Sequence, residues 1–135
     1  MQSWQSKYNR IPFVEKGRSD QGCDCWGLAC LVYKNELGIE LPDYLDVYET
    51  TNDREVLSEI IASESAEHWD HPKRGEEQPF DIIILDMRGV PMHVGIVIRK
   101  GFMIHCARGI GTTIESYDTL RWKHKVRGFA RAKRD

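Results

Sequence analysis

The chain has 135 residues and a formal net charge of -2, and 41% of its residues are hydrophobic. A chain of this length builds a core of its own but has no room for a second folded module, so we expect one domain over residues 1–135. The near balance of charge gives no indication of nucleic-acid binding, and no segment is apolar and long enough to span a bilayer. The four cysteines lie at 23, 25, 30 and 106, a spacing that matches neither paired zinc knuckles nor a disulfide framework.

The first segment predicts a short helix followed by a loop. Ser3 can cap a helix from Trp4 to about Arg10, and Ile11-Pro12-Phe13 then ends it. The run 14–22 mixes glycines with polar residues and sustains neither a helical nor a strand period, which is typical of a loop. The N-terminus has no apolar core of signal-peptide length, so we expect the chain to be made in the cytoplasm and to reach any outside target by other means.

The segment from Asp24 to Leu37 predicts the central helix of the fold. Trp26 and residues 28–33 are apolar nearly all round the helical wheel, a pattern typical of a helix that protein surrounds on most sides. Gly38 supplies the left-handed residue that ends helices, and Pro42 breaks the chain shortly afterwards.

Cys25 is the candidate nucleophile, because it falls in the first turn of this helix. The unpaired backbone N–H groups and the positive end of the helix dipole favour a thiolate there. A free thiol has a pKa of roughly 8.5 and usually needs a histidine partner as well to ionise near neutrality. Cys30 stands in mid-helix among aliphatic residues, and we interpret it as a small buried hydrophobe.

The middle of the chain predicts a second helix and a loop. Asn52 can cap a helix whose apolar residues, between 56 and 61, recur on one face. The run His68-Trp69-Asp70-His71 carries two histidines and a carboxylate, which suggests a metal site. Pro72 and the lack of a fixed secondary-structure frame favour a loop whose Trp69 docks on the core instead.

The second half predicts an antiparallel sheet. Five short runs are rich in isoleucine, valine and aromatic residues, and turn signals such as Arg88-Gly89 and Lys100-Gly101 separate them. Helices first and an antiparallel sheet afterwards form an α+β arrangement, with the central helix across one face of the sheet. The expected strands are 80–85, 94–98, 102–104, 112–116 and 126–130.

Two histidines stand at strand ends in this sheet. His93 opens the run 93–98, and His105 ends the run 102–105. A hairpin that turns at Lys100-Gly101 brings the His93 end of one strand opposite the end of the next, near or slightly beyond His105. The alternative is that each is an isolated strand-end histidine. The presence of Cys25 in the same chain favours a catalytic pair.

The last segment is basic, with frequent lysines and arginines from Arg121 to Arg134 and with Trp122 and Phe129 among them. We interpret it as a solvated last strand with flanking charge. The alternative is a surface for an anionic partner, and a nucleic-acid-binding role would depend on this segment alone.

Together these motifs resemble the NlpC-type cell-wall cysteine peptidases. The resemblance covers residues 11–131. The longer run from Ile11 through Leu28 resembles the branch found in tail-tip assembly proteins of long-tailed phages and their prophages. The motifs that carry the resemblance are Asp24-Cys25-x-Gly27-Leu28, Leu41-Pro42, Asp81 before an apolar strand, His93-Val94-Gly95-Ile96, and Met103-Ile104-His105-Cys106-Ala107.

The resemblance implies a papain-related α+β fold, in which a cysteine on the helix faces a histidine on the sheet. By position in the motifs, Cys25 matches the nucleophile, His93 the general base, and His105 the third polar residue that orients the base. The implied reaction is hydrolysis of peptide bonds in peptidoglycan stems, typically between D-glutamate and a diamino acid. It needs no metal and no organic cofactor.

Four residues in and around these motifs are expected to contact substrate: Asp24, Trp26, Tyr8 and Phe13. Many family members have a tyrosine where this chain has Phe13, and Tyr8 is a candidate to supply the missing hydroxyl. Trp26 stands where a serine commonly follows the cysteine. Pro79-Phe80 replaces the usual proline-glycine pair, which changes a turn and removes no proposed catalytic group.

Two functions of different classes follow. The first is a peptidoglycan endopeptidase in a phage or prophage tail, acting on the cell wall; the lack of an export signal and of a wall-binding module favours delivery by the tail. The second is a tail-assembly or tail-tip structural protein that uses the fold as an interaction module with other tail proteins. The set Cys25, His93 and His105 favours the first, because a structural role needs none of the three.

Overall fold

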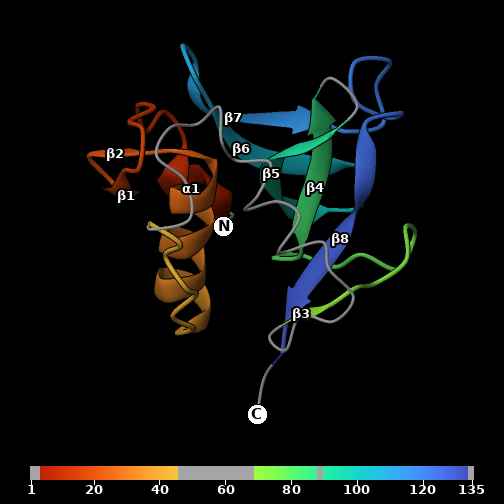
Figure 1. Ribbon diagram of the computed structural model, residues 1–135, viewed down its shortest axis with the longest axis horizontal. Coiled ribbons are helices and arrows are strands. Elements are labelled where there is room, and N and C mark those ends of the chain that lie inside the picture. The colour runs from red at the N-terminus through yellow and green to blue at the C-terminus, as the bar shows by residue number, and fades with distance from the viewer. Residues whose placement is uncertain (1–3, 46–68, 88–89, 134–135) are drawn as a thin grey trace.

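The computed structural model describes residues 4–45, 69–87 and 90–133. One helix, α1 (Cys25–Val32), lies against a six-stranded sheet in which every pair of neighbouring strands is antiparallel, which confirms the predicted α+β class (Figure 1). The strand order is β3 (Trp69–Asp70), β8 (Val126–Ala132), β4 (Ile82–Met87), β5 (Val90–Arg99), β6 (Phe102–Ala107) and β7 (Gly111–Ser116).

The N-terminal segment differs in part from the expectation. A 3-10 helix, η1 (Trp4–Tyr8), stands where an α-helix to about Arg10 was expected, and its expected cap Ser3 lies outside the described residues. The loop at 14–22 contains a small hairpin of β1 (Arg18–Ser19) and β2 (Gly22–Cys23), so the prediction of no strand there is wrong. Two-residue strands are too short to show a period in the sequence.

The central helix runs to the predicted end. Six of the eight residues of α1 are buried, as expected for a helix that is apolar all round. The helix continues as a π-helical turn, η2 (Tyr33–Leu37), and Gly38 ends it in the left-handed region with φ 67°. The widened last turn closes through the Gly38 N–H, which donates to the Lys34 and Tyr33 carbonyls.

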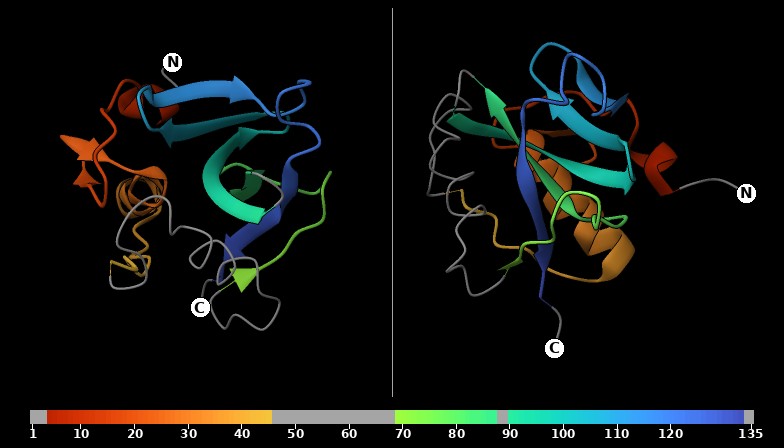
Figure 2. Two further views of the ribbon diagram at one scale, coloured as in Figure 1. Left: turned by 45° about the horizontal axis from the view of Figure 1, so that its top comes forward. Right: turned by 90° about the vertical axis from the view of Figure 1, so that its right-hand side faces the viewer.

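The hairpin at Lys100-Gly101 also forms in the predicted register. Val97 lies opposite Met103 and Ile96 opposite Ile104, so His93 falls slightly beyond the level of His105. The long strand β5 pairs with β4 through its first part and with β6 through its second part. It curves strongly between the two, which bends the sheet around one of its faces (Figure 2).

Strand alternation divides the interior into two cores. The residues of β5 and β6 that pack with α1 are Val94, Ile96, Ile104 and Cys106. The opposite face carries a second core, which contains Leu85, Val97, Met103, Trp122 and Phe129. The helix and the inside of the curved sheet are therefore separate environments, joined through the strands between them.

Trp69 docks on the core as expected, since it is only 2% exposed and meets Trp26 edge-on at 6.0 Å between ring centroids. The segment is not a loop, however, because Trp69 and Asp70 pair with β8 opposite Ala132 and Arg131. His68 and the expected helix at 52–61 lie outside the described residues. Within the described ranges no group of histidine, cysteine and carboxylate side chains is arranged to hold a metal ion, and no helix has the length and apolarity of a membrane span.

Candidate active site

Cys25 is the first residue of α1 and is 2% exposed. Asp24 caps the helix from an extended backbone, and its Oδ1 accepts the Gly27 N–H at 2.8 Å. The cap satisfies one of the N–H groups that the first turn leaves open. The local sequence thus places the thiol at the positive end of a buried helix, as the sequence predicts.

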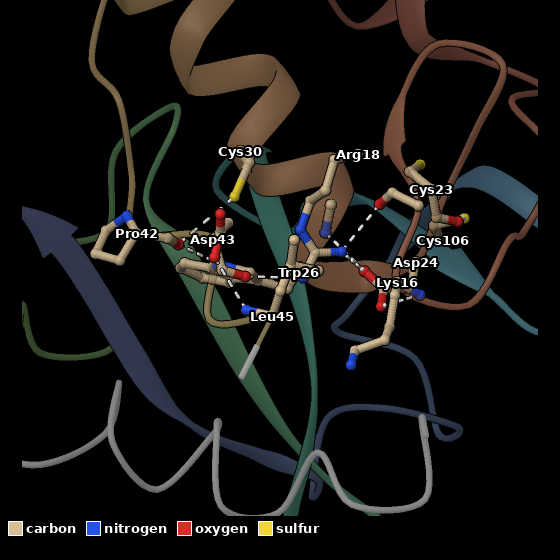
Figure 3. A network of polar contacts seen from close by, with 12 residues as sticks. Lys16, Arg18, Cys23, Asp24, Trp26, Cys30, Pro42, Asp43, Leu45 and Cys106 are labelled. Carbon is tan, nitrogen blue, oxygen red and sulfur yellow. Dashed lines mark hydrogen bonds and ion pairs between the residues drawn. The ribbon is translucent and has the colours of Figure 1, made fainter. Parts of the chain in front are cut away.

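The Asp24 carboxylate is the centre of a polar network around the helix N-terminus (Figure 3). Arg18 Nη1 donates to Oδ1 at 2.9 Å, and the Lys16 N–H donates to Oδ2 at 3.0 Å. Arg18 also donates to the Asp43 carbonyl at 2.8 Å, which ties the β1–β2 hairpin to the segment after the helix. Asp24 is wholly buried, so its described contacts hold the helix start in place from inside the protein.

Gly27 allows the β1 hairpin to approach the helix. A Cβ at this position would lie 1.9 Å from the Gly17 carbonyl oxygen and 3.2 Å from Arg18 Nη1. No side chain fits at that distance, so the absence of one lets Arg18 reach Asp24. The glycine in the motif Asp24-Cys25-x-Gly27 therefore has a packing role beside the cap.

The other expected substrate contacts lie in different places. Trp26 is wholly buried, and its Nε1 donates to the Pro42 carbonyl at 2.8 Å. The Tyr8 hydroxyl donates to Glu36 in η2 at 2.6 Å, so it lies at the opposite end of the helix from Cys25 and does not replace a hydroxyl near the thiol. Burial and this hydrogen bond raise the pKa of Tyr8 to about 12. Phe13 is half-buried, bridges to Cys23, and carries the Arg108 guanidinium 5.1 Å from its ring centroid.

The two predicted histidines meet. His93 Nε2 and His105 Nδ1 are 2.8 Å apart, and both side chains are almost fully buried, at 4% and 1% exposure. Gly95 lies on the same face of β5 as His93 and makes room for the pair, because a Cβ there would be 3.2 Å from the His105 Cβ. The interpretation of two isolated strand-end histidines is therefore wrong.

A residue that the sequence did not single out extends this pair. Glu115 on β7 lies with its Oε2 2.5 Å from His105 Nε2, and its Oε1 is 3.3 Å from Arg121 Nη1. Burial lowers the pKa of His105 below its usual value, the nearby Arg121 charge adds to this, and Glu115 opposes both. Burial raises the pKa of Glu115, but the hydrogen bond and charge of His105 outweigh it and leave the carboxyl below its usual range.

Trp122 covers the two imidazoles and was also missed. Its ring stacks on His93 with centroids 6.3 Å apart and planes at 18°, and it meets His105 edge-on at 5.5 Å. The residue is 3% exposed, so it shields both rings from water on this side. In the sequence it appears only as one aromatic within the basic last segment.

Cys25 lies in the other layer of the fold, in the core beside α1. Helix α1 packs against β5 and β6, and Cys25 shares its core with Val94 and Cys106, the chain neighbours of the two histidines. Cys106 Sγ lies 3.1 Å from the Cys23 carbonyl oxygen, which fixes the start of the helix against β6. The hydrogen bond with Cys106 and burial raise the pKa of the Cys23 thiol, so Cys23 stays protonated and leaves Cys25 as the candidate nucleophile.

A hollow of about 370 Å³ lies at the other end of the helix, lined by Tyr33, Phe80, Asp81 and Arg131 among others. Arg131 Nε and Nη2 donate to the two Asp81 oxygens at 2.7 and 2.8 Å, so these two side chains pair with each other. It lies beside η2, away from Cys25, and is not part of the candidate site.

Solved structures with this fold include three NlpC/P60 proteins. An NLP/P60 family protein similar to lipoprotein from Staphylococcus aureus subsp. aureus Mu50 is 23% identical with a TM-score of 0.66, over 96% of this chain and 39% of that one. The NlpC/p60 domain of the peptidoglycan hydrolase SagA is 22% identical with a TM-score of 0.61, over 93% and 89%. An NlpC/P60 family protein from Bacillus cereus ATCC 10987 is 23% identical with a TM-score of 0.66, over 90% and 35%.

The chain therefore spans well under half the length of the S. aureus and B. cereus proteins and most of the SagA domain. No curated protein matches its sequence. The model of the NlpC/P60 family matches residues 10–131, a range that contains the capped helix and the strands of both histidines. The chain belongs to the NlpC/P60 family.

Proposed function

We propose that this chain is a cysteine peptidase that hydrolyses peptide bonds in bacterial cell-wall peptidoglycan. The observation that carries the proposal is a cysteine at the first residue of a capped, buried helix, which packs against the two strands that bear a hydrogen-bonded histidine pair. Membership of the NlpC/P60 family supports it, as does the similarity of fold to a domain of a peptidoglycan hydrolase.

In this proposal Cys25 is the nucleophile and His93 the general base. His93 takes the thiol proton, and the imidazolium together with the helix N-terminus stabilises the thiolate that remains. His93 Nε2 faces His105, so Nδ1 is the ring nitrogen that receives the proton. His105 holds the ring in that orientation.

The thiolate then attacks the carbonyl carbon of the scissile bond. The backbone N–H of Cys25 and a neighbouring donor stabilise the oxyanion, and His93 gives its proton to the departing amine. Water, activated by the same imidazole, releases the acyl group and restores the thiol. These steps use side chains and backbone of the chain alone.

The finer assignments are also proposals. The scissile bond is the one between D-glutamate and the diamino acid of the stem peptide, as the motif resemblance implies. The site of action is the cell wall, reached as a component of a phage or prophage tail. Antibody labelling of purified virions in electron micrographs should mark the tail, and unlabelled virions would contradict that location.

The proposed activity is tested by mass spectrometry of purified muropeptides incubated with the wild-type protein, Cys25→Ala and Cys30→Ala. Cys30 is a matched control, because it stands in the same helix five residues further on. Wild type and Cys30→Ala should both give new fragments, whose masses identify the bond, and Cys25→Ala should give none. Fragments from Cys25→Ala, or none from wild type, would count against the proposal.

A further inference from the structure

Four side chains form a continuous polar line across the curved sheet. His93 Nε2 lies 2.8 Å from His105 Nδ1, His105 Nε2 lies 2.5 Å from Glu115 Oε2, and Glu115 Oε1 lies 3.3 Å from Arg121 Nη1. The residues come from β5, β6, β7 and the segment before β8. Each imidazole uses a ring nitrogen for the next member of the line.

The chemistry of this line allows one assignment of protons. An ionised carboxylate has only acceptors, so His105 Nε2 must carry the hydrogen that it shares with Glu115. A neutral His105 then has its lone pair on Nδ1, and this nitrogen must accept a hydrogen from His93 Nε2. A neutral His93 that carries its hydrogen on Nε2 has its lone pair on Nδ1.

We propose that Glu115 is a positioning residue that sets the tautomers of both histidines, so that His93 presents a basic Nδ1 to the thiol of Cys25. The idea rests on the proposed function for its role in catalysis, but the tautomers themselves are a property of the resting protein. Without Glu115, either imidazole can donate the hydrogen bond between them. When His105 Nδ1 donates, the neutral His93 carries its hydrogen on Nδ1, where it blocks proton uptake.

Burial makes this arrangement effective. His105 is 1% exposed, so no bulk water competes for its nitrogens, and burial also disfavours its charged form. The side chain of Glu115 is 25% exposed and has the Arg121 guanidinium beside it, which keeps the carboxylate ionised. The Trp122 ring packs against both imidazoles. The cations of Arg121 and Lys125 lie over the Trp122 ring, 4.9 and 5.5 Å from its centroid.

Glu115 also acts during the proton transfer. When Nδ1 of His93 takes the thiol proton, His93 becomes an imidazolium that still donates from Nε2 to His105. No proton moves to His105 or to Glu115, so the only proton transfer is from the Cys25 thiol to His93. The carboxylate supplies a negative charge at the far end of the line, which favours the imidazolium and hence the thiolate.

The direct test is nitrogen-15 NMR of the histidine side chains at about pH 8, above the usual pKa of histidine. In the wild-type protein both histidines should carry a hydrogen on Nε2, which His93 keeps when its Nδ1 takes the thiol proton. In Glu115→Gln the amide can donate as well as accept, so the signals should move to the opposite tautomer or to a mixture. A wild-type His93 with hydrogen on Nδ1 and none on Nε2 would overturn the proposal without any variant.

The second readout is the rate at which iodoacetamide modifies Cys25 near neutral pH. Glu115→Gln should lower this rate by roughly tenfold or more, as expected when a general base is misoriented. Asp86→Asn is the matched control, because Asp86 is also 25% exposed in its side chain, also pairs with an arginine, and has no described contact with an imidazole. It should leave both the tautomers and the rate unchanged.

Neither readout uses peptidoglycan, so the two proposals can fail separately. If the tautomers and the rates behave as stated but wild type cleaves no muropeptide, the proposed function fails and the role of Glu115 stands. If wild type and Glu115→Gln cleave equally fast and share one set of tautomers, the function stands and Glu115 is a structural residue only.

Discussion

At the scale of single residues, Gly27 is the position where the helix and the β1 hairpin come closest. Replacing a helical glycine by alanine normally stabilises a helix by about 1 kcal/mol. Here the new Cβ would meet the Gly17 carbonyl oxygen at 1.9 Å, and the obstacle is backbone that cannot rotate away. We expect Gly27→Ala to lower the free energy of unfolding by about 1–3 kcal/mol, because moving the hairpin outweighs the gain in helix propensity.

Urea unfolding of Gly27→Ala measures this loss, and Gly128→Ala is its control. Gly128 lies in β8, and a Cβ there would meet nothing within 4 Å. The control should be as stable as wild type or slightly more so. Equal stability of Gly27→Ala and Gly128→Ala would show that the hairpin gives way easily.

At the scale of elements, the start of α1 depends on one buried charge. The Asp24 side chain is 0% exposed and its partner Arg18 is 16% exposed, so the pair is shielded from water. Asp24→Ala removes the helix cap and leaves the guanidinium without that carboxylate. The loss should be about 3 kcal/mol in the free energy of unfolding, larger than a cap alone contributes.

The comparison for Asp24→Ala is Glu15→Ala, measured by the same denaturant titration. Glu15 pairs with Arg108 at 3.0 Å, but 33% and 64% of the two side chains are exposed. Solvent screens such a pair, so its removal should change stability by about 0.5 kcal/mol or less. A similar small loss for Asp24→Ala would mean that Arg18 finds another partner when the carboxylate is absent.

At the scale of the whole molecule, shifted pKa values make the protein less stable at both acid and alkaline pH. Burial lowers the pKa of His105 from its usual 6.5, so below about pH 6.5 the unfolded chain takes up a proton that the folded protein resists. Stability falls there, and again near pH 4.5, because the pKa values of Glu36, Glu77 and Glu115 also lie below their usual 4.5.

On the alkaline side, burial raises the pKa of Cys30 from 9.0 to about 12 and that of Tyr8 from 10.0 to about 12. The unfolded chain loses these protons first, so stability falls above about pH 9. The midpoint of urea unfolding, measured across pH, should therefore be highest between about 6.5 and 9. A midpoint that rises below pH 6.5 would contradict the assignment to His105.

The sequence allowed prediction of the parts of this fold that depend on local pattern. The all-apolar wheel and Gly38 located the helix, and the turn at Lys100-Gly101 located both histidines in the right register. The pairing of Trp69 with Ala132 was missed because a two-residue strand has no period and its partner lies at the other end of the chain. Glu115 was missed for a related reason: it meets His105 diagonally across β6 and β7, and nothing in its own strand distinguishes it from a solvated glutamate.

The packing of α1 against the sheet determines when, during synthesis and folding, Cys25 becomes reactive. The ribosome releases Cys25 long before the strands of His93 and His105, and the cysteine shares a core with those strands only after α1 docks on the sheet. A nascent or partly folded chain therefore carries an ordinary thiol with an ordinary nucleophilicity. In the proposed mechanism, chemical reactivity appears together with tertiary structure, so the cell that synthesises the chain meets the reactive thiolate only in molecules that have completed folding.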